Sequence, residues 1–404
     1  MDHDIIISGA GPAGLCLARA LRGSGLSVAL IDSQQRESLA QPAFDGREIA
    51  LTHHSRSLMQ QLGLWGLIGS DHIAPLRDAL VMNGAPGRGQ ARMRIGHEHG
   101  GQPQLGFLVG NHHIRRAAWA SAMAEPDETG SPPDLIDGRQ VVRVATDDHR
   151  AEVQLDDGRR LRARLLVAAD SRHSSTRRAM GIAADLHDYG RSMLVCAMTH
   201  PTPHGAAAWE WFDHGQTLAL LPMNDCPETG QPCSSVVLTL PHTDIEALAG
   251  TDPAPFGEAI TARFGQQLGT MRLASTRHVY PLVGVLPRHL VARRFAAVGD
   301  AAVGMHPVTA HGFNLGLRSI EALSQALIRA HHQRGDIASP ALLQRYERTH
   351  QRASRGLYLA THALATLYTR DERPARVLRE LMVRVGERLP PFKRAVAGSL
   401  TGLA

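Results

Sequence analysis

Three glycines and one acid near the N-terminus have the types and spacing that bind a dinucleotide. Gly9, Gly11 and Gly14 follow a short apolar run, and Asp32 ends the next apolar run. Glycines at these intervals allow a tight turn, close approach of the backbone to a pyrophosphate, and close packing of a helix on a strand. The acid can accept hydrogen bonds from ribose hydroxyls, and a solvated strand-end acid is its ordinary alternative. The pattern does not by itself separate FAD from NAD.

Two strands and a helix are needed to position these four residues. Residues 4–8 suit a buried parallel strand, residues 15–22 an amphipathic helix, and residues 27–31 a second strand. Together they make a complete βαβ unit, which is far more specific than the glycine pattern alone.

A second segment, residues 294–316, has the order of a buried strand, a Gly-Asp turn, a proline and a helix that opens on glycine. Such a helix N-terminus can hold an anionic group, because its first N–H groups are unpaired and carry partial positive charge. Asp300 in the turn can accept hydrogen bonds from cofactor hydroxyls or cap the turn locally. We therefore expect a second contact with the same cofactor here.

Two further features lie between these segments. Arg47 occupies a loop after Asp32, where a cation can reach a pyrophosphate, although a plain surface arginine is the alternative. The apolar strand 165–169 ends in Asp170-Ser171.

In order and type, these motifs resemble those of the class A flavoprotein monooxygenases, the para-hydroxybenzoate-hydroxylase-like group, over most of the chain. The details look closest to the bacterial ubiquinone-biosynthesis hydroxylases. That similarity is carried by residues 45–65, 105–111, 218–223, 279–282, 299–317 and 388–403. The sequence departs from the family pattern at Ser171, where glycine is usual, and at Ala310-His311, where Gly-Gln is usual.

The resemblance implies a cofactor and its contacts. The cofactor is FAD, with NAD(P)H as a transient reductant, since only one βαβ unit is complete; no metal is expected. The expected FAD contacts are Gly9, Gly11, Ala13, Gly14, Asp32, Arg47, Arg115, Asp300, Gly312, Phe313 and Asn314. Pro307, His311 and Gly312 are expected beside the reacting face of the flavin, and His306, Tyr189 and Tyr280 are further candidates for hydrogen bonding.

The resemblance also implies an α/β fold with α+β elements. A Rossmann-like FAD-binding domain (1–75, 106–181 and 284–350) is interleaved with an antiparallel-sheet substrate domain (76–105 and 182–283). A helical C-terminal region follows at 351–404. Alternating runs with turn signals within 192–240 predict the antiparallel sheet independently. Trp209, Trp211, Leu221 and Met223 are candidates for lining an apolar pocket on whichever face is inside.

The implied reaction is hydroxylation of the aromatic ring of a polyprenylated phenol or quinol in ubiquinone biosynthesis, with O2, through a C4a-hydroperoxyflavin. Two alternatives stay open. One is a class A hydroxylase or epoxidase acting on another aromatic or isoprenoid substrate. The other is a non-catalytic flavin-bearing subunit of a quinone-biosynthesis complex.

Composition narrows the classes of partner. The net charge of +5 is spread along the chain and aromatic content is only 4%, which argues against nucleic-acid binding. No apolar run reaches the roughly 18 residues of a membrane span, and no signal peptide precedes the first strand. We expect a cytoplasmic protein. Arginines alternate with large apolar residues after 375, which suits either peripheral membrane contact or a helix packed on the FAD domain with its basic face in water.

Overall fold

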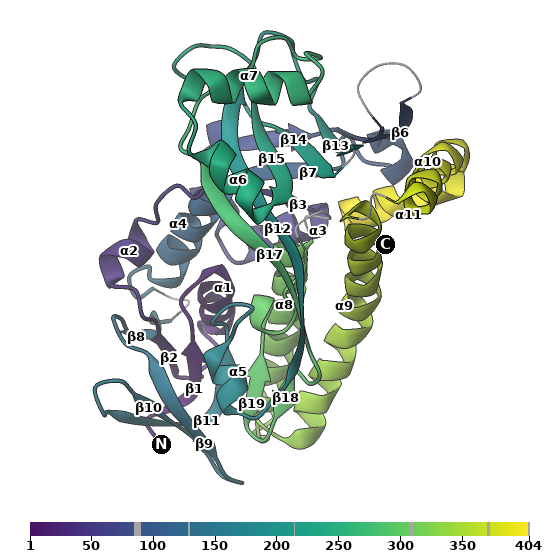
Figure 1. Ribbon diagram of the computed structural model, residues 1–404. Coiled ribbons are helices and arrows are strands. Elements are labelled where there is room, and N and C mark those ends of the chain that lie inside the picture. Colours follow the sequence, from purple (N-terminus) through teal and green to yellow (C-terminus); the bar gives the residue numbers. More distant parts are fainter. Residues whose placement is uncertain (85–89, 128–129, 214, 307–310, 370–371, 403–404) are drawn as a thin grey trace.

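The computed structural model describes residues 1–84, 90–127, 130–213, 215–306, 311–369 and 372–402. In this part of the chain the strands form three sheets, and the chain passes between them more than once (Figure 1).

The first sheet is built around the N-terminal strand. β1 (His3–Ser8) pairs in parallel with β2 (Val28–Ile31) and with β11 (Arg160–Ala168), which pairs in parallel with β19 (Phe295–Ala297). Central parallel strands are covered on both faces, and this explains the unbroken apolar run of β1. The other strands of this sheet are β8 (Asp134–Ile136), β9 (Val141–Thr146), β10 (Ala151–Leu155) and β18 (Val291–Ala292).

Helices bring the two cofactor motifs together on this sheet. α1 (Pro12–Leu21) follows β1, and α8 (Gly312–His332) packs beside α1. The remaining helices of this half are α2 (Arg36–Ala40), α3 (His53–Gln61), α4 (Asn111–Ala122) and α5 (Ser175–Ala179). The predicted βαβ unit is confirmed, because β1 and β2 are parallel neighbours joined by α1.

The second sheet is mainly antiparallel, as predicted. Its order is β16-β12-β15-β14-β13-β5-β6, with β17 also on β12. The bounds are β5 (Asp78–Asn83), β6 (Ala91–Ile95), β12 (Ala184–Thr199), β13 (Ala207–Asp213), β14 (Gln216–Pro222), β15 (Cys233–Pro241), β16 (Arg272–Leu273) and β17 (His278–Pro287). One face packs on α6 (His242–Ala249) and α7 (Pro253–Arg263).

This packing corrects part of the pocket prediction. Trp211 is fully buried in the cluster that includes Phe256 and Phe264, and Trp209 packs against the same cluster. Both tryptophans therefore face the two covering helices. Leu221 lies on the opposite face, against the third sheet.

The third sheet lies between the other two. It consists of β3 (Glu48–Leu51), β7 (Gly106–Gly110) and β4 (Ile73–Leu76), all antiparallel. Ala50 and Leu108 of this sheet join a cluster with Val81 and Leu221 of the second sheet.

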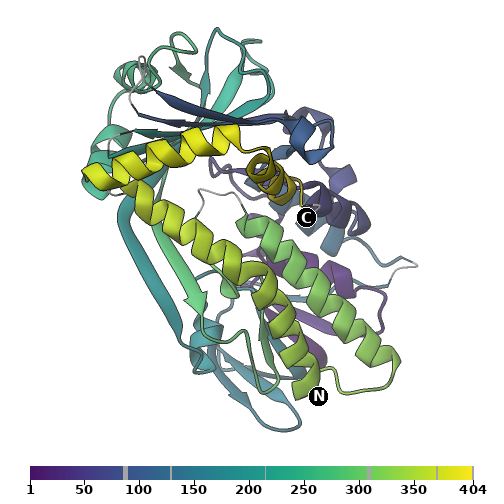
Figure 2. The same cartoon turned by 90° about the vertical axis from the view of Figure 1, so that its right-hand side faces the viewer.

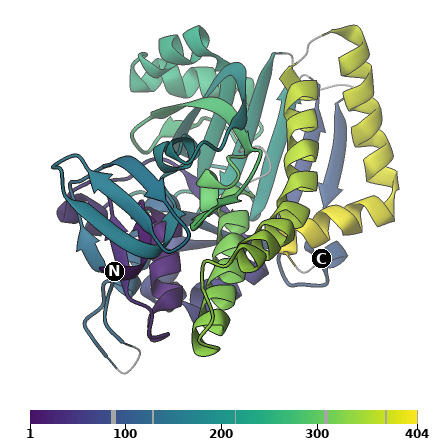
Figure 3. The ribbon, with the colours of Figure 1, turned by 90° about the horizontal axis from the view of Figure 1, so that it is seen from below.

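Three helices end the described chain: α9 (Pro340–Thr369), α10 (Arg373–Arg388) and α11 (Pro390–Thr401). α9 begins at Pro340, earlier than the expected start of the helical region at 351, and runs from the first sheet toward the second, where α10 lies along β5 and β6 (Figure 2). Seen from below, these helices lie on the opposite side of the molecule from the N-terminus (Figure 3). α10 thus packs on the second sheet, which contradicts the alternative of a helix packed on the FAD domain.

Candidate cofactor and active site

The first glycine motif forms a cradle with one open side. Gly9 has φ +107°, and a Cβ there would lie 2.5 Å from the carbonyl oxygen of Ala169; a Cβ at Gly14 would overlap the carbonyl of Gly9. A Cβ at Gly11 would meet nothing within 4 Å. Packing therefore requires glycine at positions 9 and 14, whereas Gly11 borders open space that a cofactor backbone contact would fill.

Asp32 lies at the rim of this cradle. Its Oδ2 accepts a hydrogen bond from the Ala10 N–H at 2.6 Å, and its Oδ1 accepts one from the Gln34 N–H at 2.8 Å. Each oxygen keeps a further lone pair for a ribose hydroxyl. Within the described chain no side chain caps α1, so its N-terminus is available to a pyrophosphate.

The Gly-Asp segment meets the same cradle from the other side. Gly299 has φ +60°, and a Cβ there would lie 2.7 Å from the Ala13 Cβ, so glycine is required between α1 and α8. A Cβ at Gly312 would lie 3.9 Å from Asp300 Oδ1. Asp300 also pairs with Arg172 at 3.3 Å. The structure therefore brings Ala13, Asp300 and Gly312 together, although their contacts with FAD stay predictions.

Ser171 has the backbone conformation that the family's glycine would supply. Its φ is +77°, in the left-handed region that favours glycine. The preceding Asp170 anchors the turn by accepting from the Thr176 N–H at 3.0 Å and from the hydroxyls of Thr176 and Ser174. This departure in sequence thus keeps the turn geometry.

The start of α8 is tied to two other segments. Asn314 accepts from the Thr52 N–H at 3.1 Å and donates to the Ala50 carbonyl at 2.8 Å, so it holds β3 against α8. His311 is buried, and its Nε2 lies 3.4 Å from the carbonyl oxygen of Ser399 on α11. Phe313 packs against the core of the first sheet. Pro307 lies outside the described residues.

Arg47 is held by groups beside it. Its Nη2 lies 2.6 Å from Asp45 Oδ2, and its guanidinium stacks over the Tyr280 ring at 5.3 Å. Burial would raise the pKa of Asp45, but hydrogen bonds and charge from Arg47 hold that pKa below its usual value. Arg115, on α4, lies 3.4 Å from Gln34 Oε1, near the loop after Asp32. Both arginines thus border the expected cofactor region.

Two partly buried carboxyl groups were not singled out from the sequence. Glu48 follows Arg47 on β3, and burial, together with the charge of Asp45, raises its pKa to about 8. Glu210 lies on the inner face of the second sheet, opposite Ala219, and burial raises its pKa to about 8. No local motif marks either acid, since their burial depends on which strand faces lie inside.

A second group of rings extends from His306. The Tyr189 ring lies 4.7 Å from the His306 ring, and the Tyr189 hydroxyl lies 2.9 Å from His362 Nδ1. Burial raises the pKa of Tyr189 to about 12 and lowers that of His306 to about 4. The structure thus brings together two predicted candidates with His362, which was not predicted, while Tyr280 lies apart beside Arg47.

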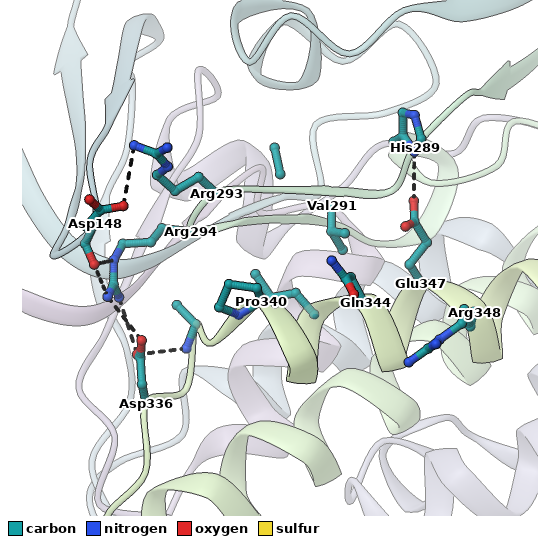
Figure 4. Close-up of a pocket in the computed structure, with 13 residues that line it drawn as sticks. Asp148, His289, Val291, Arg293, Arg294, Asp336, Pro340, Gln344, Glu347 and Arg348 are labelled. Carbon is teal, nitrogen blue, oxygen red and sulfur yellow. Dashed lines mark hydrogen bonds and ion pairs between the residues drawn. The ribbon is translucent and has the colours of Figure 1, made fainter.

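A pocket elsewhere on the surface does not involve the predicted site residues. It lies between β18 and α9, and its walls carry the pairs Arg294–Asp336 and His289–Glu347 (Figure 4).

Comparisons with known proteins agree with this geometry. The profile of the family described as FAD binding domain matches residues 2–359. Ubiquinone hydroxylase UbiM of Neisseria meningitidis is 42% identical over 404 residues, which are 100% of this chain and 85% of that protein. Ubiquinone hydroxylase UbiL of Rhodospirillum rubrum is 32% identical over 391 residues, 97% of this chain and 87% of that protein. The solved structure of PqsL, a probable FAD-dependent monooxygenase from Pseudomonas aeruginosa, has a TM-score of 0.73 at 21% identity, covering 94% of this chain and 99% of its own.

Proposed function

The chain belongs to the FAD binding domain family, and from that premise we propose that it hydroxylates the aromatic ring of a polyprenylated phenol or quinol in ubiquinone biosynthesis. It would use FAD, NAD(P)H and O2. One observation carries the proposal: a ubiquinone hydroxylase matches the whole length of this chain at 42% identity. The glycine cradle and the Gly-Asp turn, which meet at one place, support it.

The residues at that place fit the cofactor. Gly11 and the start of α1 would receive the pyrophosphate, Asp32 the ribose, Asp300 the ribityl chain, and Gly312 the ring. When bound, FAD supplies the electron transfer and oxygen activation that side chains do not supply. The protein's part is to bind, orient and exclude water.

We propose that Glu48 is the base that accepts the proton of the substrate phenol. Loss of that proton makes the ring a better nucleophile, and a base is most useful when its pKa lies near the working pH. Glu48 lies between Arg47 and Ala50, and Ala50 is bonded to Asn314 at the start of α8. Its carboxyl lies near Asp45 and Gly110, and burial with the charge of Asp45 raises its pKa to about 8.

Profiling of quinone intermediates in a strain that lacks this gene tests the proposed function. We expect one under-hydroxylated prenyl phenol or quinol to accumulate and to disappear when the gene is restored. An unchanged profile would reject the assignment. Substrate-dependent oxidation of NAD(P)H by the purified protein then separates the other options. Turnover of a soluble aromatic acid or an isoprenoid instead would support another reaction of the family.

Peripheral membrane contact, or contact with a quinone-biosynthesis complex, is a further part of this proposal. None of the described helices combines the length and apolar character needed to cross a bilayer. A substrate with a polyprenyl tail partitions into lipid, so the protein has to reach it there or receive it from a partner.

A further inference from the structure

Large apolar side chains gather on one outward side of α10 and at the start of α11. Thirteen such side chains are exposed in the described part of the protein, and seven of them lie between 377 and 392. We call these seven the α10 apolar face: Val377, Leu378, Leu381, Met382, Val385, Leu389 and Phe392. A soluble surface seldom concentrates apolar groups this way unless it binds something.

The same helix uses a different side to pack on the protein. Ala375, Arg379 and Val383 are buried, four residues apart, and α10 contacts β5 and β6. A Cβ at Gly386 would lie 2.6 Å from the Met93 Sδ, so the helix lies close against β6. Since this inner side already packs on the protein, the α10 apolar face is a second, separate side of the helix and is exposed to solvent.

The charge of this segment is positive. Residues 372–394 hold seven basic and three acidic residues. Two of the acids pair within the segment, Glu380 with Arg384 at 2.6 Å and Glu387 with Lys393 at 2.8 Å. Exposed Arg376, Arg388 and Arg394 form no ion pair with any residue that the structure describes. An apolar stripe beside unpaired arginines is typical of a helix that lies in the interface of an anionic membrane.

α11 connects this face to the candidate active site. It starts directly after α10, and its Ser399 contacts His311 at the start of α8. Arg318 of α8 donates to the Gly402 carbonyl at 3.2 Å, and a Cβ at Gly402 would lie 2.7 Å from the Thr52 hydroxyl oxygen. A surface held by α10 would therefore lie one short helix away from the expected flavin ring.

We propose that the α10 apolar face docks on the surface of an anionic lipid bilayer and inserts its apolar side chains among the acyl chains. The inference rests on the proposed function in one respect, since a prenylated substrate explains why the site needs a membrane beside it. The arginines pair with lipid phosphates, and the apolar side chains leave water, so both parts of the surface are satisfied by one partner.

Vesicle co-sedimentation of the FAD-loaded protein tests the docking. The vesicles are phosphatidylcholine alone or phosphatidylcholine with about one quarter phosphatidylglycerol, the anionic lipid that the arginines need. We expect binding to the anionic vesicles that weakens in high salt. The combined variant Leu378→Ser, Leu381→Ser and Val385→Ser should bind these vesicles more weakly, by at least about tenfold. A matched variant with Leu67→Ser, Val142→Ser and Leu186→Ser, which are exposed apolar residues elsewhere, should bind like the parent.

Equal vesicle binding by the parent and by the Leu378/Leu381/Val385 variant would overturn the proposal. A dimeric parent protein in the absence of lipid, seen by light scattering, would also overturn it if the Leu378/Leu381/Val385 variant were a monomer. The α10 apolar face would then join two copies of the protein. Leu381→Trp gives an independent readout: its fluorescence should shift to the blue with anionic vesicles, and an unchanged spectrum counts against docking.

Turnover of a water-soluble, short-chain phenol separates this proposal from the proposed function. The docking variant should keep that turnover, because its substitutions lie outside the site. Vesicle binding by a protein that hydroxylates no prenyl phenol would reject the function and leave the docking intact. Hydroxylation of a prenyl phenol by a protein that does not bind vesicles would reject the docking and leave the proposed function intact.

Discussion

At the scale of single residues, the carboxyl groups are what most distinguish this site. Asp32, Asp45 and Asp170 each accept hydrogen bonds from neighbouring N–H groups, and for Asp45 an arginine adds its charge. Glu48 lacks a comparable donor among the described residues, and its pKa is raised, whereas the pKa of Asp45 is lowered. With this raised pKa the carboxyl gains its charge only as pH rises toward 8, and the carboxylate form is the one that can accept a proton from the substrate.

Glu48→Gln should change the pH dependence of stability. The folded state keeps the proton up to about pH 8, whereas the unfolded chain loses it near the ordinary pKa of 4.5. The parent therefore loses stability as pH rises through this window. Gln cannot ionise, so the variant should gain on the parent, by on the order of 2–4 kcal/mol at pH 8 and almost nothing at pH 4.5. Urea unfolding at both pH values measures this.

The exposed Glu246→Gln is the control for that experiment and should change little at either pH. A difference between parent and Glu48→Gln that does not vary with pH would show that the carboxyl is not a buried acid. In turnover, Glu48→Gln should lower kcat by about 10²-fold and remove a rising limb near pH 8. Substrate binding should be nearly unchanged.

Asp300→Ala should weaken FAD binding. Its carboxylate, which is expected to bond the ribityl chain, lies beside Gly312, and a lost hydrogen bond to a charged group costs about 1.5–3 kcal/mol, or roughly tenfold or more in affinity. Titration of the apoprotein with FAD measures the effect. Asp157→Ala, an acid far from the cradle on a turn after β10, should bind FAD like the parent. Normal FAD affinity in Asp300→Ala would refute the geometry proposed for this turn.

At the scale of elements, α1 and β1 explain why the three glycines are not equivalent. The glycines at 9 and 14 are required by contact between a helix and strands, whereas Gly11 faces open space. Packing and cofactor binding can therefore be separated by comparing two substitutions in one motif.

Gly14→Ala should destabilise the protein by about 3 kcal/mol, because its Cβ overlaps a backbone carbonyl that cannot move without the strand. Gly11→Ala should unfold at the parent's temperature as apoprotein but lose most of its FAD. Thermal unfolding without FAD, and the flavin absorbance of the purified protein, measure the two effects. Equal apoprotein stability of the two variants would contradict the packing account.

At the scale of the whole molecule, the C-terminal helices join the two large sheets. α9 starts at the first sheet, α10 packs on the second, and α11 returns to the start of α8. Residues near the C-terminus thereby reach the start of α8, which borders the expected cofactor site. α10 is attached to the second sheet through its contacts with β5 and β6.

Val383→Ala should loosen that attachment. Val383 is 2% exposed and packs with Met93 and Ile95, so its truncation should cost about 1–3 kcal/mol locally. Limited proteolysis should then cleave within 372–390 several-fold faster than in the parent. Val377→Ala removes the same two methyl groups from a side chain that is 65% exposed, and should not change the cleavage rate. Equal cleavage rates for the parent and both variants would show that Val383 does not contribute to the attachment of α10.

The sequence by itself determined the βαβ unit, the Gly-Asp turn before a helix and the antiparallel second sheet. Each of these depends on residues that are close along the chain, where glycine spacing and apolar periodicity act directly. The approach of Asp300 to Gly312 was also predictable, because few residues separate them.

Only the tertiary structure decided which faces lie inside. It turned Trp209 and Trp211 toward α6 and α7, placed Glu48 in a partly buried position beside Asp45, and set Ser171 in a left-handed turn. It also packed α10 through Ala375, Arg379 and Val383, which left its apolar residues in water. These outcomes depend on contacts between segments far apart in the chain. An amphipathic pattern states that two faces differ, and the neighbouring elements decide which face is covered.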